Sequence, residues 1–270
     1  GDVYNRQAQW SHNRYRIYYP KTMGDAVWSM YDYNRGCCDN ICYSGVADIF
    51  RLPKFSLSFF RTQIAEGSML PSGKMPYEVF IPAYRDEILS ETVMVYGNVD
   101  EVELVLNGKT IRRQTADKGP DSDYIPVPNG GNGKNLHFPP FTFYGVPKER
   151  GVLKAVGYHQ GKKVAEYTVK TPGVPERLDI TYFESGKPAT KNDLLIVYVR
   201  MLDKQGVLCP VNGIPVELSV QGGEIVGPTS YPLEAGVASF LVRTGEISKI
   251  NINATGKGFS TRKSLKVGKE

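Results

Sequence analysis

The sequence predicts a mainly β protein, in which two consecutive immunoglobulin-like β-sandwiches follow a shorter helix–strand–helix segment. From about residue 75 onward, apolar and polar side chains alternate with a period of two, as they do in half-buried strands. Turn signals rich in Gly, Pro and Asn interrupt this alternation at the short intervals typical of sandwiches. Before residue 67, apolar residues recur instead at helical spacing on both sides of a short apolar run.

The N-terminal segment predicts a helix over residues 5–19 and a buried strand over 24–33 with Ala26, Val27 and Trp28 at its heart. A second helix is expected over 52–67, with Gly67 as its end signal. The apolar face of that helix would consist of Phe55, Phe59 and Phe60. One such unit cannot bury its own apolar surface. We therefore expect it to pack on the first sandwich, to form a homodimer, or to be partly disordered.

Two hairpins mark the first sandwich. Residues 101–113 alternate around Asn107-Gly108, the strongest short turn signal for a hairpin, and residues 151–171 turn at Gln160-Gly161. The Pro/Gly-rich stretch at 171–177 predicts a boundary, after which alternation resumes as a second sandwich. The expected domains are 1–66, 67–172 and 173–270.

Composition excludes several classes of function. The net charge of +5 over 270 residues is mild, and Lys and Arg are dispersed, so nucleic acid is not an expected partner. No apolar run reaches the roughly 20 residues that a membrane helix needs. Cys37, Cys38 and Cys42 crowd together, but their spacing fits no zinc pattern, and we expect packing roles with no metal and no cofactor.

Residues 25–65 carry the most specific motifs. The stretches VWSMYDYN and SGVADIFRLPKFSLSFFRTQ resemble the last strand and helix of the (β/α)8 catalytic barrel in glycoside hydrolase family 2, the β-galactosidase group. The stretches VMVYGNVDEVELVLNGK and FPPFTFYGVPKERGVLKAVGYHQGKKVAEYTVKTPG are similar to a sandwich that follows this barrel. The rest resembles a bacterial immunoglobulin-like module. The resemblance thus implies a barrel remnant followed by two accessory sandwiches.

The resemblance implies that Trp28 contributes to a galactose pocket at a strand end, where (β/α)8 barrels place their active sites. Asp32, Asn34 and Arg35 lie in the loop that follows and are candidates for hydrogen bonds to sugar hydroxyls. Some family members bind sodium through an Asn just before the Gly of the motif, but here that position is Ser44.

Retaining glycosidases need two carboxylates about 5–5.5 Å apart. In the resembled family both come from earlier barrel strands, so we expect no catalytic residue in this chain and no activity of the chain alone. The acids Asp25, Asp32, Asp39 and Asp48 are expected to be loop and cap residues.

The leading interpretation is therefore the C-terminal region of a retaining β-galactosidase-like exoglycosidase. Its partners would be a terminal β-linked sugar and the rest of the parent enzyme, and its location periplasmic or extracellular in a bacterium. One alternative is a non-catalytic carbohydrate-binding module that uses the aromatic cluster near residues 120–145. Another is a spacer or adhesion protein based on residues 177–267. The residues of the aromatic cluster are Tyr124, His137, Phe138, Phe141, Phe143 and Tyr144.

Overall fold

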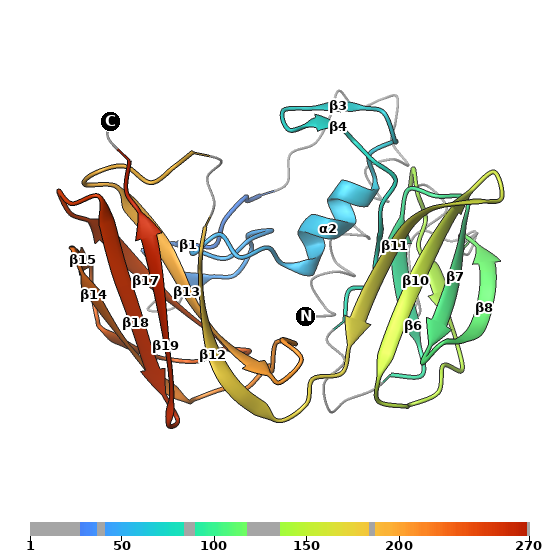
Figure 1. Cartoon of the computed structure of the whole chain (residues 1–270). Helices are drawn as coiled ribbons and strands as arrows, with labels where there is room; N and C mark the ends of the chain where they lie inside the picture. The colour runs from blue at the N-terminus through green and yellow to red at the C-terminus, as the bar shows by residue number, and fades with distance from the viewer. Residues whose placement is uncertain (1–27, 37–40, 84–89, 118–135, 184–186, 269–270) are drawn as a thin grey trace. The chain divides into compact units, whose positions relative to one another are not determined.

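The computed structural model describes residues 28–36, 41–83, 90–117, 136–183 and 187–268. The chain divides into two compact units, Gly1–Lys170 and Thr171–Glu270, and the division falls at the start of the Pro/Gly-rich stretch. Most of the described secondary structure is β, as the sequence predicts (Figure 1). The expected helix at 5–19 lies outside the described residues.

In the first unit, two sheets enclose one core. The three-stranded sheet has the order β5-β6-β9 and the four-stranded sheet the order β11-β10-β7-β8. Alternate side chains of both sheets point into a shared apolar cluster, which includes Val95 and Phe141 from one sheet and Leu104 and Leu153 from the other. The strands are β5 (Val79–Phe80), β6 (Val93–Gly97), β7 (Glu101–Leu106), β8 (Lys109–Thr115), β9 (Phe141–Phe143), β10 (Val152–His159) and β11 (Lys162–Lys170).

Both predicted hairpins of this sandwich are confirmed. Strands β7 and β8 pair on either side of Asn107-Gly108, and β10 and β11 pair around Gln160-Gly161. All four turn residues have positive φ, at 51° and 80° in the first turn and 49° and 75° in the second. Two-residue hairpin turns of this mirror-image type require positive φ at both positions. They are favoured in hairpins because their backbone twist matches that of the flanking strands.

The helix α2 (Phe55–Thr62) lies beside this sandwich (Figure 1). It contacts the sandwich through Phe55 and Phe59 of its predicted apolar face. Phe59 is fully buried, and its ring lies 5.1 Å from the ring of Tyr96 in β6. The helix ends at Thr62, with Gln63 as its C-cap, so the predicted end at Gly67 was wrong. Two further pairs of short strands are described in this unit: β1 (Tyr33–Asn34) with β2 (Ile41–Cys42), and β3 (Met69–Leu70) with β4 (Gly73–Lys74).

The second unit is a sandwich of two four-stranded sheets, with strand orders β12-β13-β17-β15 and β16-β14-β18-β19. A single apolar cluster between them includes Val199, Met201, Phe240 and Ile250. The first strand begins at Pro175, so only the first part of the predicted 171–177 linker lies outside a strand. The strands are β12 (Pro175–Tyr182), β13 (Leu194–Asp203), β14 (Pro215–Gln221), β15 (Gly223–Ile225), β16 (Ser230–Pro232), β17 (Val237–Thr244), β18 (Lys249–Gly256) and β19 (Phe259–Lys266).

Candidate functional site

The segment that carries the family motifs is held together by its backbone. Tyr31 and Ala47 form a parallel bridge, and the amide of Asp32 donates to the carbonyl of Ala47 over 3.0 Å. The amide of Val46 donates in turn to the carbonyl of Ser29 over 3.1 Å. The stretch that begins at Trp28 is therefore aligned with the motif that begins at Gly45.

Asp32 is the buried centre of this segment, with 6% of its surface exposed. Its Oδ1 accepts hydrogen bonds from the backbone amide of Gly45 over 2.8 Å and from Nζ of Lys54 over 2.6 Å. The same ammonium group donates to the carbonyl of Tyr43 over 3.1 Å. One carboxylate thus connects the strand end, the loop and the residue that precedes α2.

Gly45 has no room for a side chain. A Cβ atom there would lie 2.3 Å from the amide nitrogen of Asp32 and 2.3 Å from the carbonyl carbon of Tyr31. Both are backbone atoms of the bridged stretch, so they cannot move aside cheaply. The glycine of the motif is explained by this close backbone approach.

Trp28 is strongly exposed, with 73% of its surface accessible. The expectation that it lies at the heart of a buried strand was wrong; Ala26 and Val27 lie outside the described residues. Its indole Nε1 donates to Oη of Tyr33 over 2.8 Å, and the two rings meet edge to face with centroids 6.0 Å apart. Nε of Arg35 donates to the same Oη over 3.2 Å. The exposed indole is thereby held in one orientation by a tyrosine that sequence reasoning did not select.

Asn34 lies beside this group and is exposed. Its Oδ1 accepts the amide hydrogen of Gly36 over 2.8 Å, which closes a local turn. The structure therefore places Trp28 and Asn34 on the surface of one short segment, whereas Asp32 lies buried beneath it.

The thiol of Cys42 lies 3.3 Å from the hydroxyl of Ser44. This hydrogen bond is the largest cause that lowers the pKa of the Cys42 thiol, and Tyr33 and Arg35 act in the same direction. Within the described part of the chain, no group of three or more His, Cys, Asp or Glu side chains could hold a metal ion. Cys37 and Cys38 lie outside it.

Asp48 accepts the amide hydrogen of Leu52 over 2.8 Å and so stabilises the turn before α2. Burial raises the pKa of its carboxyl above the ordinary value. The carboxylates of Asp48 and Asp32 both bind the segment's own backbone, as expected of loop and cap residues. Asp25 and Asp39 lie outside the described residues.

The aromatic cluster near residues 120–145 divides between core and surface. Phe141 and Phe143 are fully buried between the sheets, whereas Tyr144 is 46% exposed. The ring of His137 lies 4.3 Å from that of Phe138, whose backbone is bound by the side chain of Gln63. Of the five described members, Phe141 and Phe143 thus pack inside the sandwich, Phe138 is partly buried, and His137 and Tyr144 are exposed. Tyr124 lies outside the described residues.

Comparison with known proteins places this fold and segment in one family. A family model described as a domain of unknown function, DUF4982, matches residues 90–165. A β-galactosidase of Thermoanaerobacter pseudethanolicus is 32% identical over 241 residues, which are 83% of this chain and 30% of that enzyme. A β-galactosidase of Rhizobium radiobacter is 30% identical over 129 residues, which are 47% of this chain and 92% of that sequence.

The solved structure of a glycosyl hydrolase family 2 member from Bacteroides cellulosilyticus matches with a TM-score of 0.69 at 19% identity. The match covers 96% of this chain and 36% of that one, and it supports the fold. The chain belongs to glycoside hydrolase family 2 and corresponds to a C-terminal part of such an enzyme. It spans about a third of the length of the curated relatives it matches first.

Proposed function

We propose that this chain is the C-terminal region of a retaining β-galactosidase-like exoglycosidase and supplies one wall of its sugar pocket. One observation carries the proposal: an exposed tryptophan is held in a fixed orientation at the start of the segment that resembles the end of a catalytic barrel. The similarity to β-galactosidases over 83% of the chain supports the choice of sugar.

In this proposal each residue has a separate role. The indole face of Trp28 stacks on the apolar face of a sugar ring, a contact in which aromatic side chains provide large area at fixed geometry. Asn34 offers an exposed amide for hydroxyl groups. Asp32 positions the loop through Gly45 and Lys54. The two catalytic carboxylates would come from the region that precedes this one in the longer relatives.

The sandwiches would serve as braces for the barrel. Support comes from α2, whose apolar face packs on the first sandwich through Phe59 and Tyr96.

We further propose a periplasmic or extracellular location. No helix in the described part of the chain is long and apolar enough to cross a membrane.

A chimeric enzyme tests the proposal. The matching C-terminal region of the Thermoanaerobacter β-galactosidase is replaced by this chain, and hydrolysis of a chromogenic β-galactoside is measured as kcat/KM. We expect measurable hydrolysis by the chimera and none by the chain alone. Trp28→Ala in the chimera should lower kcat/KM by about tenfold or more, since about 1.4 kcal/mol of lost transition-state binding corresponds to that factor.

Tyr231→Ala provides the control, because Tyr231 is an exposed aromatic residue of the second unit. It should leave kcat/KM unchanged. Turnover by the isolated chain at a rate typical of an enzyme would contradict the assignment of the catalytic groups to the preceding region. A Trp28→Ala chimera as active as its parent would contradict the role of Trp28.

A further inference from the structure

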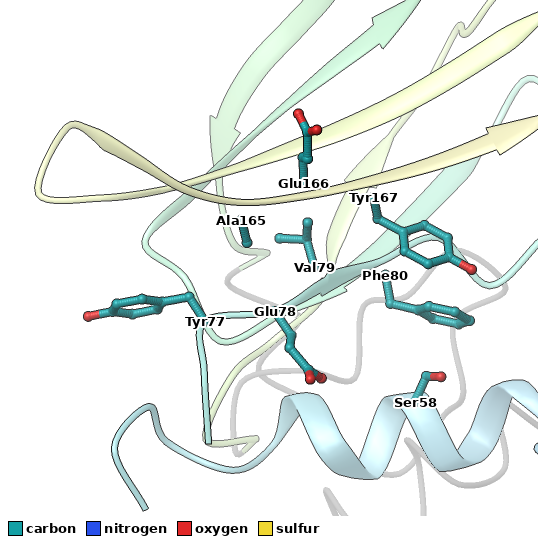
Figure 2. A pocket seen from close by; sticks show the side chains of 8 residues that line it. All are labelled: Ser58, Tyr77, Glu78, Val79, Phe80, Ala165, Glu166 and Tyr167. Atoms are coloured by element: carbon teal, nitrogen blue, oxygen red, sulfur yellow. The ribbon is translucent and has the colours of Figure 1, made fainter. Parts of the chain in front are cut away.

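The first unit contains a groove whose position differs from that of the Trp28 segment. It has a volume of about 390 Å³ and is lined by side chains from α2, from β5 with the residues before it, and from β11 (Figure 2). Ligand pockets of proteins commonly measure about 300–1,000 Å³, so this groove suits a small ligand. Its lining residues are Ser58, Tyr77, Glu78, Val79, Phe80, Ala165, Glu166 and Tyr167.

The groove exists because two sheet edges meet without pairing. Among the described strands, β5 pairs with β6, and β11 pairs with β10. The edges of β5 and β11 face one another across the opening, and α2 passes along one side of it (Figure 2). The backbone fold itself therefore forms the groove, and it does not depend on one flexible side chain.

Aromatic rings form one end of the groove. Phe80 and Tyr167 lie side by side with ring centroids 4.8 Å apart, and both are half-buried (Figure 2). Phe55 of α2 extends this group, with its ring 5.8 Å from that of Phe80. Half-buried rings next to a cavity offer the flat apolar contact on which the carbon–hydrogen face of a sugar ring can stack.

Polar groups that can donate and accept hydrogen bonds lie beside these rings. Glu78, which directly precedes β5, points toward α2 (Figure 2). Its carboxylate forms an ion pair with Arg61 of that helix. This ion pair holds the carboxylate in place and leaves it with unused lone pairs. Ser58 adds a hydroxyl on the helix side of the same space.

This chemistry favours a neutral polyhydroxylated ring over other ligands. Among the described residues that line the groove, both acidic side chains are paired with a cation: Arg61 binds Glu78, and Lys163 binds Glu166 over 2.6 Å. An organic cation would therefore find no unbalanced negative charge on them. A peptide that adds as a strand would meet the charged side chains of Lys162, Lys163 and Lys170 along β11, which disfavour such pairing. We propose that this groove binds a saccharide unit of a neutral glycan, as an accessory binding site of the first sandwich.

Direct binding to the full chain tests this site. Titrations with lactose, cellobiose and sodium glucuronate are followed by saturation-transfer NMR and calorimetry up to about 50 mM, where affinities of about 1 mM are readily measured. We expect binding of at least one neutral disaccharide by the wild-type chain. Ser58→Trp places a large side chain in the groove. It should weaken disaccharide binding by about tenfold or more, a factor that corresponds to 1.4 kcal/mol. Glu78→Gln should weaken it several-fold.

Ser260→Trp is the matched control, because Ser260 is exposed on β19 in the second unit. It should leave binding unchanged, and thermal melts should confirm that each variant is folded. The proposal fails if neither disaccharide binds, if only glucuronate binds, or if Ser58→Trp binds as tightly as the wild type.

The groove proposal does not depend on the proposed function of the Trp28 segment. The substitution Trp28→Ala tells the two apart. Binding that survives Trp28→Ala but not Ser58→Trp supports the groove. Binding that is lost with Trp28→Ala and kept with Ser58→Trp would overturn the groove and support the sugar contact of Trp28. Hydrolysis by the chimera is a separate readout and does not decide this question.

Discussion

At the scale of single residues, the second unit contains a buried carboxylate that organises a turn. Asp203 is 4% exposed, and its Oδ1 accepts the amide hydrogens of Gln205 and Val207, each over 2.8 Å. Its Oδ2 accepts the amide hydrogen of Gly173, also over 2.8 Å. Burial acts to raise the pKa of this carboxyl, but the backbone amides outweigh it and hold the pKa below the ordinary value of 3.8.

Asp203→Asn tests this arrangement. The substitution places an amide NH2 or a weaker acceptor opposite the backbone donors, which should cost about 1–3 kcal/mol of unfolding free energy. Because the folded-state pKa is depressed, the wild-type carboxylate contributes its stability above pH 3.8 and loses it as the pH falls through the folded value. The unfolding free energy of the second unit can be measured by denaturation at several pH values between 3 and 7. It should depend more strongly on pH in the wild type than in the variant.

Glu217→Gln serves as the control because Glu217 is exposed on β14. It should change neither the stability nor its pH dependence. An Asp203→Asn variant with wild-type stability at pH 7 would show that the three amide contacts contribute little.

At the scale of elements, the two hairpin turns of the first sandwich form a natural comparison. Asn107 and Gln160 occupy the same turn position with nearly equal φ, at 51° and 49°. Only Asn107 also uses its side chain across the sheet: Oδ1 accepts the amide hydrogen of Val152 over 2.9 Å, and Nδ2 donates to the carbonyl of Arg150 over 3.0 Å. Asn107 therefore fixes both its own turn and the start of β10.

Asn107→Gly should destabilise the first unit by about 1–2 kcal/mol, because it removes two hydrogen bonds while glycine tolerates the positive φ. Gln160→Gly is the matched change at a turn without these side-chain bonds, and it should be nearly neutral. Urea denaturation with a probe of the first unit measures both. Equal effects of the two substitutions would mean that the two side-chain hydrogen bonds of Asn107 add no stability.

The elements also show what sequence periodicity can and cannot predict. The hairpins follow from signals within a few residues, such as alternation around Asn107-Gly108, and these predictions were correct. The predicted end of the second helix at Gly67 was wrong, since α2 ends at Thr62 with Gln63 as its C-cap. The side chain of Gln63 forms a distant contact that was not foreseen either: its Nε2 donates to the carbonyl of Phe138 over 2.8 Å. A contact between positions 75 residues apart leaves no local pattern in the sequence.

The candidate site was predictable in the same limited sense. Trp28, Asp32 and Asn34 all lie in the segment that the family motif marked. The hydrogen bond from Trp28 to Tyr33 and the burial of Asp32 were not foreseen, because they depend on how the loop folds back. The partners of Asp32 are 13 and 22 positions away, at Gly45 and Lys54.

At the scale of the whole molecule, the two units have separate cores. The apolar clusters of the first unit include Phe59 and Leu104, and the cluster of the second includes Phe240 and Ile250, with no shared residue. Each unit therefore has the apolar interior that a cooperative unfolding transition needs.

We expect two thermal unfolding transitions, one for each unit. Phe59→Ala should lower the midpoint temperature of the first unit's transition, and Phe240→Ala that of the second unit's, while the other transition stays unchanged. Truncation of a buried phenylalanine costs about 3–5 kcal/mol, and both side chains are at most 1% exposed. Differential scanning calorimetry measures the two transitions. Leu194→Ala is the control, since Leu194 is 51% exposed. A single transition that shifts as a whole with either substitution would show that the units unfold together.

The outer strands of the sandwiches bear on how this chain behaves at high concentration. Among described strands, β11 and β19 each pair on one side only. Exposed Lys162 and Lys170 lie on β11, and exposed Arg262 and Lys266 lie on β19. Charged side chains on an open edge oppose the edge-to-edge stacking of chains that leads to fibrils. Replacement of these lysines and arginines by threonine or valine should therefore increase the tendency of the protein to aggregate, while the cores stay intact.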